Sequence, residues 1–301
     1  DPKRIIGAQK HLNDNTLIIG FARRFATYKR AYLLFSNLER LAALVNNPEK
    51  PIVFLFAGKA HPNDRPGQDI IKMIVEISKR PEFLGKILFL ENYDIDLAKK
   101  LVQGVDIWLN TPTRPLEASG TSGMKAVMNG GLHFSVLDGW WVEGYKDKAG
   151  WALPLEKTYD DQDMQNQLDA EMIYNIFETE VRPLFYDRNK DDVPEGWIKY
   201  VKNSIAQVFP EFTMRRMIDD YRDRFYNKLF ERAELIRKDS YHNARMVSMW
   251  KKKVSRSWNE IEVVKNDLIE IIGKSLKMQE TYSGEVILNT GVLNAKDIGV
   301  E

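Results

Sequence analysis

The sequence has no cysteine, no long apolar run and almost no net charge, and each absence excludes a class of protein. Without cysteine among its 301 residues, the chain has no disulfide framework and no thiolate zinc site. Its histidines, His11, His61, His133 and His242, lack the spacing of metal ligands. The apolar runs are far shorter than the roughly 20 residues that span a membrane. Lysine and arginine number 44 against 43 acidic residues, so no basic field predicts nucleic-acid binding. We expect a cytoplasmic protein with neither a membrane nor a nucleic-acid partner.

The most informative segment reads Glu-Ala-Ser-Gly-Thr-Ser-Gly-Met-Lys over residues 117–125. The run 105–109 before it is typical of a buried strand, and residues 124–128 have the composition of a helix start. A strand, a turn of glycine and hydroxyl residues, and a helix form an anion-binding geometry, because free backbone N–H groups and the positive helix end meet there. A lysine beside such a turn suits a phosphorylated aldehyde that reacts with its amine. Most glycine-rich turns bind nothing, so further observations have to support this interpretation.

A second basic segment follows an apolar run near the start of the chain. Residues 17–22 are typical of a strand, and Arg23, Arg24, Lys29 and Arg30 come directly after it. Open α/β sheets bind their ligands at the carboxyl ends of strands. The alternative is a solvated basic loop. Two such loops at equivalent strand ends favour a shared anionic ligand.

Short apolar runs alternate with longer helical patterns between residues 15 and 150. The expected strands are 17–22, 51–57, 86–90, 105–109 and 131–136, and the expected helices are 30–46, 67–79, 95–103 and 122–130. This alternation predicts an α/β fold with a doubly wound, mostly parallel sheet.

Four blocks of sequence, taken in order, resemble the C-terminal portion of the α-glucan (glycogen or starch) phosphorylases, in particular their shorter bacterial and archaeal branch. The blocks are residues 20–30, 56–60, 90–93 and 117–145, and together they span most of residues 15–155. The resemblance implies that the α/β part is the C-terminal Rossmann-like domain of a GT-B glycosyltransferase.

The resemblance also implies a cofactor site and a phosphate site. Lys125 matches the lysine that carries pyridoxal 5′-phosphate covalently, and the cofactor phosphate then acts beside the substrate phosphate as a proton relay. Arg24 and Lys29 match ligands of the substrate and cofactor phosphates, which with Lys125 form the expected catalytic set. Arg23 stands where the animal enzymes have lysine near the cofactor phosphate, and Tyr93 matches an aromatic position close to the cofactor.

The turn at 117–123 divides into two roles under the same resemblance. Glu117 would accept a hydrogen bond from a glucosyl hydroxyl, and the backbone of Ser119 and Gly120 would bind neighbouring hydroxyls. Thr121 and Ser122 would face the cofactor phosphate. Ser122-Gly123 replaces the Gly-Asn of the animal pattern, so a contact through an amide side chain at position 123 is lost, whereas backbone contacts to phosphate are kept.

The implied reaction is retaining phosphorolysis of an α-1,4-glucan by inorganic phosphate to give glucose 1-phosphate. The family's active site lies between two domains, and nothing in this sequence matches the N-terminal one. We therefore expect the chain to need that domain as a partner. By itself, the chain should bind the cofactor weakly or not at all and turn over no glucan. The family also implies that a homodimer can form.

Three other functions were weighed. A glycogen or starch synthase shares the architecture but uses nucleotide sugars and needs no covalent cofactor. A non-catalytic glucan-binding module would use Trp140, Trp141 and Trp151 as platforms for sugar rings. A glycosidase would pair Glu117 with Asp138 or Glu143, although their spacing does not favour that pairing.

The expected domain organisation has three parts: residues 1–158 form the cofactor- and phosphate-binding domain, 159–280 a helical part packing on it, and 281–301 the start of a truncated β appendage. Apolar stripes recur at helical spacing, namely at Met217, Tyr221, Phe225 and Leu229, at Trp250, Val254 and Trp258, and at Leu268, Ile271, Ile272 and Leu276. We expect most of these helices to cover the sheet; packing on the N-terminal domain is the alternative. The strand-like run 286–289 is expected to be unpaired or disordered unless it docks on another edge.

Overall fold

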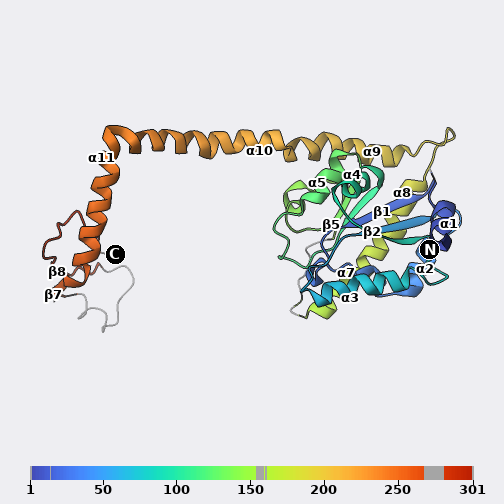
Figure 1. Cartoon of the computed structure of the whole chain (residues 1–301), viewed down its shortest axis with the longest axis horizontal. Helices are drawn as coiled ribbons and strands as arrows, with labels where there is room; N and C mark the ends of the chain where they lie inside the picture. The colour runs from blue at the N-terminus through green and yellow to red at the C-terminus, as the bar shows by residue number, and fades with distance from the viewer. Residues whose placement is uncertain (1, 14, 154–158, 160, 268–280, 300–301) are drawn as a thin grey trace. The chain divides into compact units, whose positions relative to one another are not determined.

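The computed structural model describes residues 2–13, 15–153, 159, 161–267 and 281–299. The chain forms two compact units, Asp1–Met217 and Ile218–Glu301 (Figure 1). The expected domain boundaries after residues 158 and 280 fall outside the described residues and stay predictions. The stripe from Leu268 to Leu276 also lies outside them.

The larger unit is built on a parallel sheet in which the direction of winding reverses once. Its described strands are β1 (Leu17–Ala22), β2 (Ile52–Ala57), β3 (Ile87–Leu90), β4 (Ile107–Asn110), β5 (Leu132–Val136) and β6 (Gly150–Leu153). Their order is β3-β2-β1-β4-β5-β6, and every neighbouring pair is parallel. The reversal lies between β1 and β4, where open α/β sheets bind their ligands. The expected doubly wound α/β fold is confirmed.

Helices cover both faces of this sheet (Figure 1). Leu17, Ile19 and Phe21 of β1 belong to a core that includes α2 (Leu38–Val45), α3 (Arg65–Ile77) and α7 (Gln162–Ile176). Ile18 and Ala22 belong to a second core with α4 (Ile95–Gly104) and α5 (Thr121–Met128). Successive side chains of a strand point to opposite faces, so a strand that is covered on both sides is apolar throughout. Two further α-helices precede β1 and β6, namely α1 (Pro2–His11) and α6 (Trp141–Gly144).

Two expectations about this unit were wrong. The helix expected at 30–46 is broken into 3₁₀ turns at Thr27–Lys29 and Leu33–Phe35 followed by α2. Arg30 has a left-handed φ of 49°, and the side chain of Asn37 caps α2 by accepting a hydrogen bond from the backbone N–H of Arg40, so the helix begins only there. The strand β6 was not expected. Its four residues, Gly-Trp-Ala-Leu, are too short a run to be distinguished from a loop by periodicity.

The helices after β6 divide between the two units. α7, a π-helical turn at Phe177–Val181, α8 (Arg182–Tyr186) and α9 (Glu195–Asn203) contribute to the core of the sheet. Two further turns, π-helical Ser204–Val208 and 3₁₀ Phe209–Phe212, lead to α10 (Met214–Tyr221), and residues Arg222–Tyr226 join α10 to α11 (Asn227–Ser257).

Apart from Met217, the residues of the first two apolar stripes lie in the second unit. Tyr221, Phe225 and Leu229 are 44%, 53% and 60% exposed, and Trp250 and Trp258 are exposed as well. The expectation that these helices cover the sheet of the first unit stays a prediction. The faces of the sheet are already occupied by the helices α2 to α5 and α7.

The second unit ends in a small antiparallel sheet. α11 is interrupted at Lys238–Tyr241, where Asp239, Ser240 and Tyr241 have positive φ. A 3₁₀ turn at Trp258–Glu260 leads to β7 (Glu262–Asn266), which pairs with β8 (Val286–Asn289). The run 286–289 is thus a strand as expected, but it is paired, because β7 supplies the hydrogen-bonding edge. Across the described part of the chain, no helix combines the length and the apolarity needed to cross a membrane.

Candidate active site

Two loops lie side by side at the reversal point of the sheet. The loop that follows β1 begins at Arg23, and the loop between β4 and α5 covers residues 111–120. The backbone N–H of Thr113 donates to the carbonyl of Tyr28 at 2.7 Å, and the hydroxyl of Thr111 donates to the carbonyl of Lys29 at 2.9 Å. These bonds join the two sequence segments that were expected to share a ligand.

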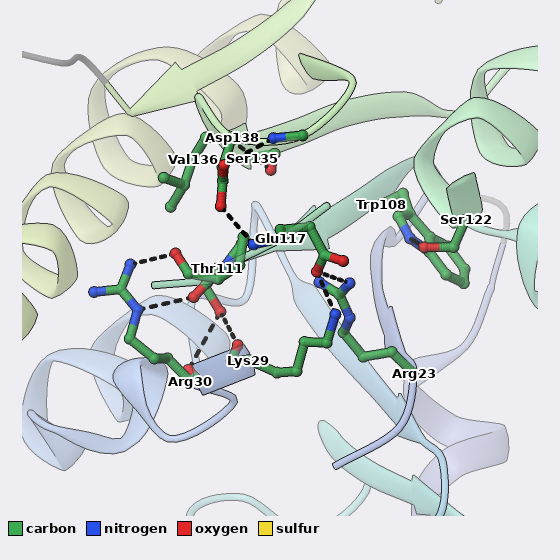
Figure 2. A network of polar contacts seen from close by, with 12 residues as sticks. Arg23, Lys29, Arg30, Trp108, Thr111, Glu117, Ser122, Ser135, Val136 and Asp138 are labelled. Atoms are coloured by element: carbon green, nitrogen blue, oxygen red, sulfur yellow. Dashed lines mark hydrogen bonds and ion pairs between the residues drawn. The ribbon is translucent and has the colours of Figure 1, made fainter. Parts of the chain in front are cut away.

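Arg23, Lys29 and Glu117 meet between these loops and form a buried group that we call the ion cluster (Figure 2). Nη2 of Arg23 lies 2.5 Å from Oε2 of Glu117, and Nζ of Lys29 contacts the same oxygen. The side chains of Arg23 and Lys29 are 8% exposed and that of Glu117 is 12% exposed. Two cations against one carboxylate leave a net positive charge in a site largely shielded from water.

Two of the three guanidinium nitrogens of Arg23 make no hydrogen bond to the described residues. Its Nε and Nη1 are buried and have no hydrogen-bond partner among the described residues. Burial lowers the pKa of Arg23, and the charge of Glu117 opposes that shift. Buried donors without acceptors are costly, and a guanidinium presents its N–H groups in a fork that matches phosphate oxygens. The cluster therefore suits an additional anion with several oxygens.

The turn that carries Glu117 is held by the chain after β5. One carboxylate oxygen of Asp138 accepts the backbone N–H of Glu117 at 2.8 Å, and the other accepts that of Gly139 at 2.9 Å. Gly139 has φ 55°, and a Cβ there would lie 2.4 Å from the carbonyl oxygen of Ser119. Both carboxylate oxygens of Asp138 thus hold the backbone of this turn. Glu143, the other acid considered, is exposed. This arrangement gives no support to a glycosidase pair.

The helix α5 begins at the expected turn. Gly120 takes the left-handed conformation with φ 80°, and the helix follows from Thr121. Thr121 is exposed, and the half-buried hydroxyl of Ser122 accepts a hydrogen bond from Nε1 of Trp108 at 3.1 Å. Lys125 is four residues after Thr121, so both lie on one face of the helix, and side chains lean toward the helix N-terminus. Lys125 is exposed on that face.

Gly123 packs directly against the ring of His133. A Cβ at position 123 would lie 2.5 Å from Cε1 of His133, so no larger residue fits without displacing the imidazole. His133 is fully buried, and its Nδ1 lies 3.1 Å from the carbonyl oxygen of Trp108. Burial lowers the pKa of His133 to about 3, so the ring is neutral. The imidazole thus occupies the space that a side chain at position 123 would need.

Of the expected site residues, the structure brings some together and leaves others apart. Arg23, Lys29 and Glu117 are in contact, and Ser122 is tied to Trp108. Tyr93 packs in the second core beside Trp108, and burial raises its pKa. The remaining ones, Arg24, Ser119, Gly120, Thr121 and Lys125, make no hydrogen bond or ion pair with the ion cluster within the described ranges. All of their roles stay predictions.

Sequence reasoning missed the residues that support the site. The sequence suggested Asp138 only as an acid, Trp108 only as part of a strand and Arg30 only as one of four clustered cations. It suggested His133 only as part of a strand and as a histidine without metal-ligand spacing. Arg30 is in fact 1% exposed. Its one available signal was a position at the end of the cation cluster, which does not distinguish a solvated side chain from a buried one.

The structure thus defines an open α/β protein with a buried cationic site at the carboxyl ends of its strands. Residues 5–150 match the family model described as carbohydrate phosphorylase, and this part of the chain belongs to that family. The resemblance to the α-glucan phosphorylases is confirmed.

Three relatives show how much of such a protein the chain represents. It is 44% identical over 290 residues to maltodextrin phosphorylase of Thermococcus litoralis, which covers 96% of this chain and 33% of that protein. It is 49% identical over 231 residues to glycogen phosphorylase of Aquifex aeolicus, covering 77% and 33%. Against glycogen phosphorylase of Mycobacterium bovis the identity is 37% over 253 residues, covering 84% and 29%. The chain spans about a third of the length of these curated relatives.

The tryptophans considered as sugar platforms are buried. Trp140 and Trp151 are each 4% exposed and Trp141 is fully buried, with its indole N–H donating to the carbonyl of Trp151 at 2.9 Å. A ring enclosed in the core cannot stack on a sugar that approaches from solvent. The burial of all three rings gives no support to the alternative of a glucan-binding module that uses these tryptophans.

Proposed function

We propose that this chain supplies the cofactor- and phosphate-binding part of a pyridoxal phosphate-dependent α-1,4-glucan phosphorylase. One observation carries the proposal: within the family match, Arg23 and Lys29 meet at the reversal point of the sheet, and two buried nitrogens of Arg23 have no described partner. Such a site is suited to phosphate.

The residues around α5 fit the cofactor. Lys125 would hold it covalently, with Thr121, Ser122, Arg23 and Lys29 around its phosphate and Tyr93 beside its ring. The N-terminal turn of α5 offers free backbone N–H groups, and Lys125 is exposed on the face of Thr121. When bound, the cofactor would supply a phosphate that exchanges a proton with the substrate phosphate, so that the pair of phosphates would protonate the leaving glycosidic oxygen.

The chain's own side chains would neutralise charge and orient the sugar. Two phosphates repel each other, and cations placed between them reduce that repulsion. Arg24 would bind the substrate phosphate, and Lys29 would lie at the cofactor phosphate. Glu117 would accept a hydrogen bond from a glucosyl hydroxyl, and the backbone of Ser119 and Gly120 would bind the neighbouring hydroxyls of the same sugar. With phosphate held below the ring, cleavage would retain the anomeric configuration.

The proposal assigns activity to the full-length protein, because the chain spans only about a third of its relatives. The N-terminal domain would complete the sugar and phosphate sites. We propose that the chain alone binds pyridoxal phosphate weakly or not at all and turns over no glucan, and that the protein works in the cytoplasm and can form a homodimer.

The test is phosphorolysis by the full-length protein. With maltodextrin, inorganic phosphate and pyridoxal phosphate, it should release α-glucose 1-phosphate, whereas Lys125→Ala and the isolated chain should not. Parallel assays with UDP-glucose and ADP-glucose address the synthase alternative. Glucosyl transfer from a nucleotide sugar without phosphorolysis would contradict the proposed reaction. Phosphorolysis by the isolated chain would contradict the proposal that the chain alone turns over no glucan.

A further inference from the structure

Arg30 is the most deeply buried cation next to the ion cluster. It follows Lys29 directly, and its left-handed φ of 49° turns its side chain away from solvent to 1% exposure. A buried guanidinium is stable only if its N–H groups find acceptors. Arg30 finds them on two other parts of the chain.

The contacts of Arg30 reach the β4–α5 loop and α7 (Figure 2 shows those to the loop). Its Nε donates to the carbonyl of Thr111 at 2.9 Å, and its Nη2 donates to that of Pro112 at 3.0 Å. On α7, Nη1 donates to Oδ1 of Asn166 at 3.0 Å, and Nη2 lies 2.7 Å from Oδ2 of Asp169. We call Arg30, Thr111, Pro112, Asn166 and Asp169 the Arg30 clamp.

The clamp is fixed from both ends. The hydroxyl of Thr111 donates to the carbonyl of Lys29 at 2.9 Å and approaches that of Arg30 at 3.2 Å, which ties the loops together a second time. The carboxylate of Asp169 is 3% exposed, and its Oδ1 accepts a hydrogen bond from Gln165 at 2.7 Å. α7 in turn is anchored in the core of the sheet. The clamp therefore links both loops to α7.

We propose that Arg30 is a positioning residue for the phosphate site: through the clamp it sets the register of the two loops, and so the approach of Lys29 to Glu117. The inference rests on the proposed function. Within the described residues, the side chain of Arg30 makes no hydrogen bond or ion pair with any of the three side chains of the ion cluster. It adjoins Lys29 in sequence, however, and binds the carbonyl groups that begin the loop of Glu117. Lysine could supply the charge of Arg30 but not its planar fork of donors.

The experiment compares Arg30→Lys with a matched control in the full-length protein. Arg40→Lys is the control, because the guanidinium of Arg40 also makes a forked pair, with Glu178 at 2.8 and 2.7 Å. With a further contact to Glu171 it joins α2 to α7 and the following turn, and none of these contacts involves the two loops of the site. Asn166→Ala, which removes one clamp hydrogen bond and no charge, is a milder variant in case Arg30→Lys does not fold. The readouts are amide hydrogen exchange of Thr113 and Arg30, the KM for inorganic phosphate, the KM for glucan and the thermal midpoint.

We expect Arg30→Lys to speed exchange of the Thr113 amide, which donates to Tyr28, and to raise the KM for phosphate about tenfold or more while the KM for glucan changes little. Arg40→Lys should lower only the thermal midpoint. If Arg30→Lys also lowers only the midpoint, or raises both KM values equally, the positioning role is wrong.

Hydrogen exchange separates this inference from the proposed function, because it requires no turnover. The wild-type protein could perform no phosphorolysis while Arg30→Lys still speeds exchange of the Thr113 amide more than Arg40→Lys does. In that case the proposed function is wrong and the positioning role of Arg30 is supported. If the exchange rate of Thr113 is the same in both variants, the positioning role is wrong whether or not the protein is active.

Discussion

Two buried arginines on one loop, Arg23 and Arg30, show how the same side chain serves different ends. In the Arg30 clamp, Nε, Nη1 and Nη2 all have acceptors, which come from the β4–α5 loop and α7. In the ion cluster, Arg23 pairs through Nη2 alone, and Nε and Nη1 have no described partner. The guanidinium of Arg30 uses all three of its nitrogens within the chain, whereas that of Arg23 keeps two buried nitrogens without a described partner. Buried donors without acceptors lower stability, but they can bind a ligand. The comparison predicts that damage to the clamp lowers stability together with phosphate binding, and that damage to the ion cluster lowers anion binding with a smaller loss of stability.

The largest expected effect comes from removing the partner of Arg30. Asp169→Ala leaves a buried charge without its counter-ion, and we expect a loss of about 3–5 kcal/mol in the free energy of unfolding. Chemical denaturation of the chain, followed by tryptophan fluorescence, measures it. Glu117→Gln in the ion cluster is the contrasting variant and should cost clearly less. Equal losses would erase the distinction between the two regions.

The next effect concerns His133, which lies beside the start of α5. Its pKa is about 3 in the folded chain against 6.5 for a free imidazole, so the unfolded state binds more protons between these values. The contribution is fully present above pH 6.5 and is lost as pH falls toward 3, by about 1.4 kcal/mol per pH unit. His133→Gln should therefore lose less stability than wild type on acidification, as equilibrium unfolding at several pH values would show.

Asp106 acts in the opposite direction and supplies the control for that series. Burial raises its pKa from 3.8 to about 6, while its hydrogen bond from the backbone N–H of Ile18 opposes the shift. Its contribution is present below pH 3.8 and is lost as pH rises through 6. Asp106→Asn should thus steepen the loss on acidification between pH 6 and 4 relative to wild type. Parallel pH profiles for the two variants would contradict both assignments.

A smaller effect is expected where α5 meets His133. Gly123→Ala places a methyl group in the volume of the imidazole, and overpacking of this kind costs about 1–3 kcal/mol. Gly104→Ala is the matched control, because nothing lies within 4 Å of its Cβ position at the end of α4, and it should be neutral or slightly stabilising. If the clash with the imidazole causes this loss, Gly123→Ala should cost less in a chain that already carries His133→Ala than in the wild-type chain.

The smallest effect is expected in the second unit. Arg222 pairs with Asp219 and Asp223, but all three side chains are largely exposed. Exposed ion pairs gain little because water and salt screen them. Arg222→Ala should leave the thermal midpoint of the chain unchanged, in contrast to the clamp variants. A clear drop in the midpoint would show that contact distance, rather than burial, decides the value of an ion pair here.

The sequence predicted most of the sheet and the turn before α5, because both depend on local patterns. Apolar runs such as 17–22 and 131–136 mark strands that are buried on two sides, and the segment 117–125 identified the turn before α5. The parallel order then places both basic and glycine-rich loops at one edge.

The support of the site could not be predicted, because it depends on pairs far apart in the chain. Arg30 and Asp169 are 139 residues apart, and nothing near either one indicates the other. The same long-range demand for a buried Arg30 interrupts the helix expected at 30–46. The stripe at Tyr221, Phe225 and Leu229 makes a related point: periodicity indicates an apolar face but not what covers it.

The most direct test of the account is covalent labelling at Lys125. The full-length protein would be incubated with pyridoxal phosphate, reduced with borohydride and analysed by intact mass and peptide mapping, with Lys125→Arg as the control. The account predicts one pyridoxyl phosphate group, attached at Lys125 and absent from the control. A folded protein that carries no label, or carries it only on other lysines, would contradict the account.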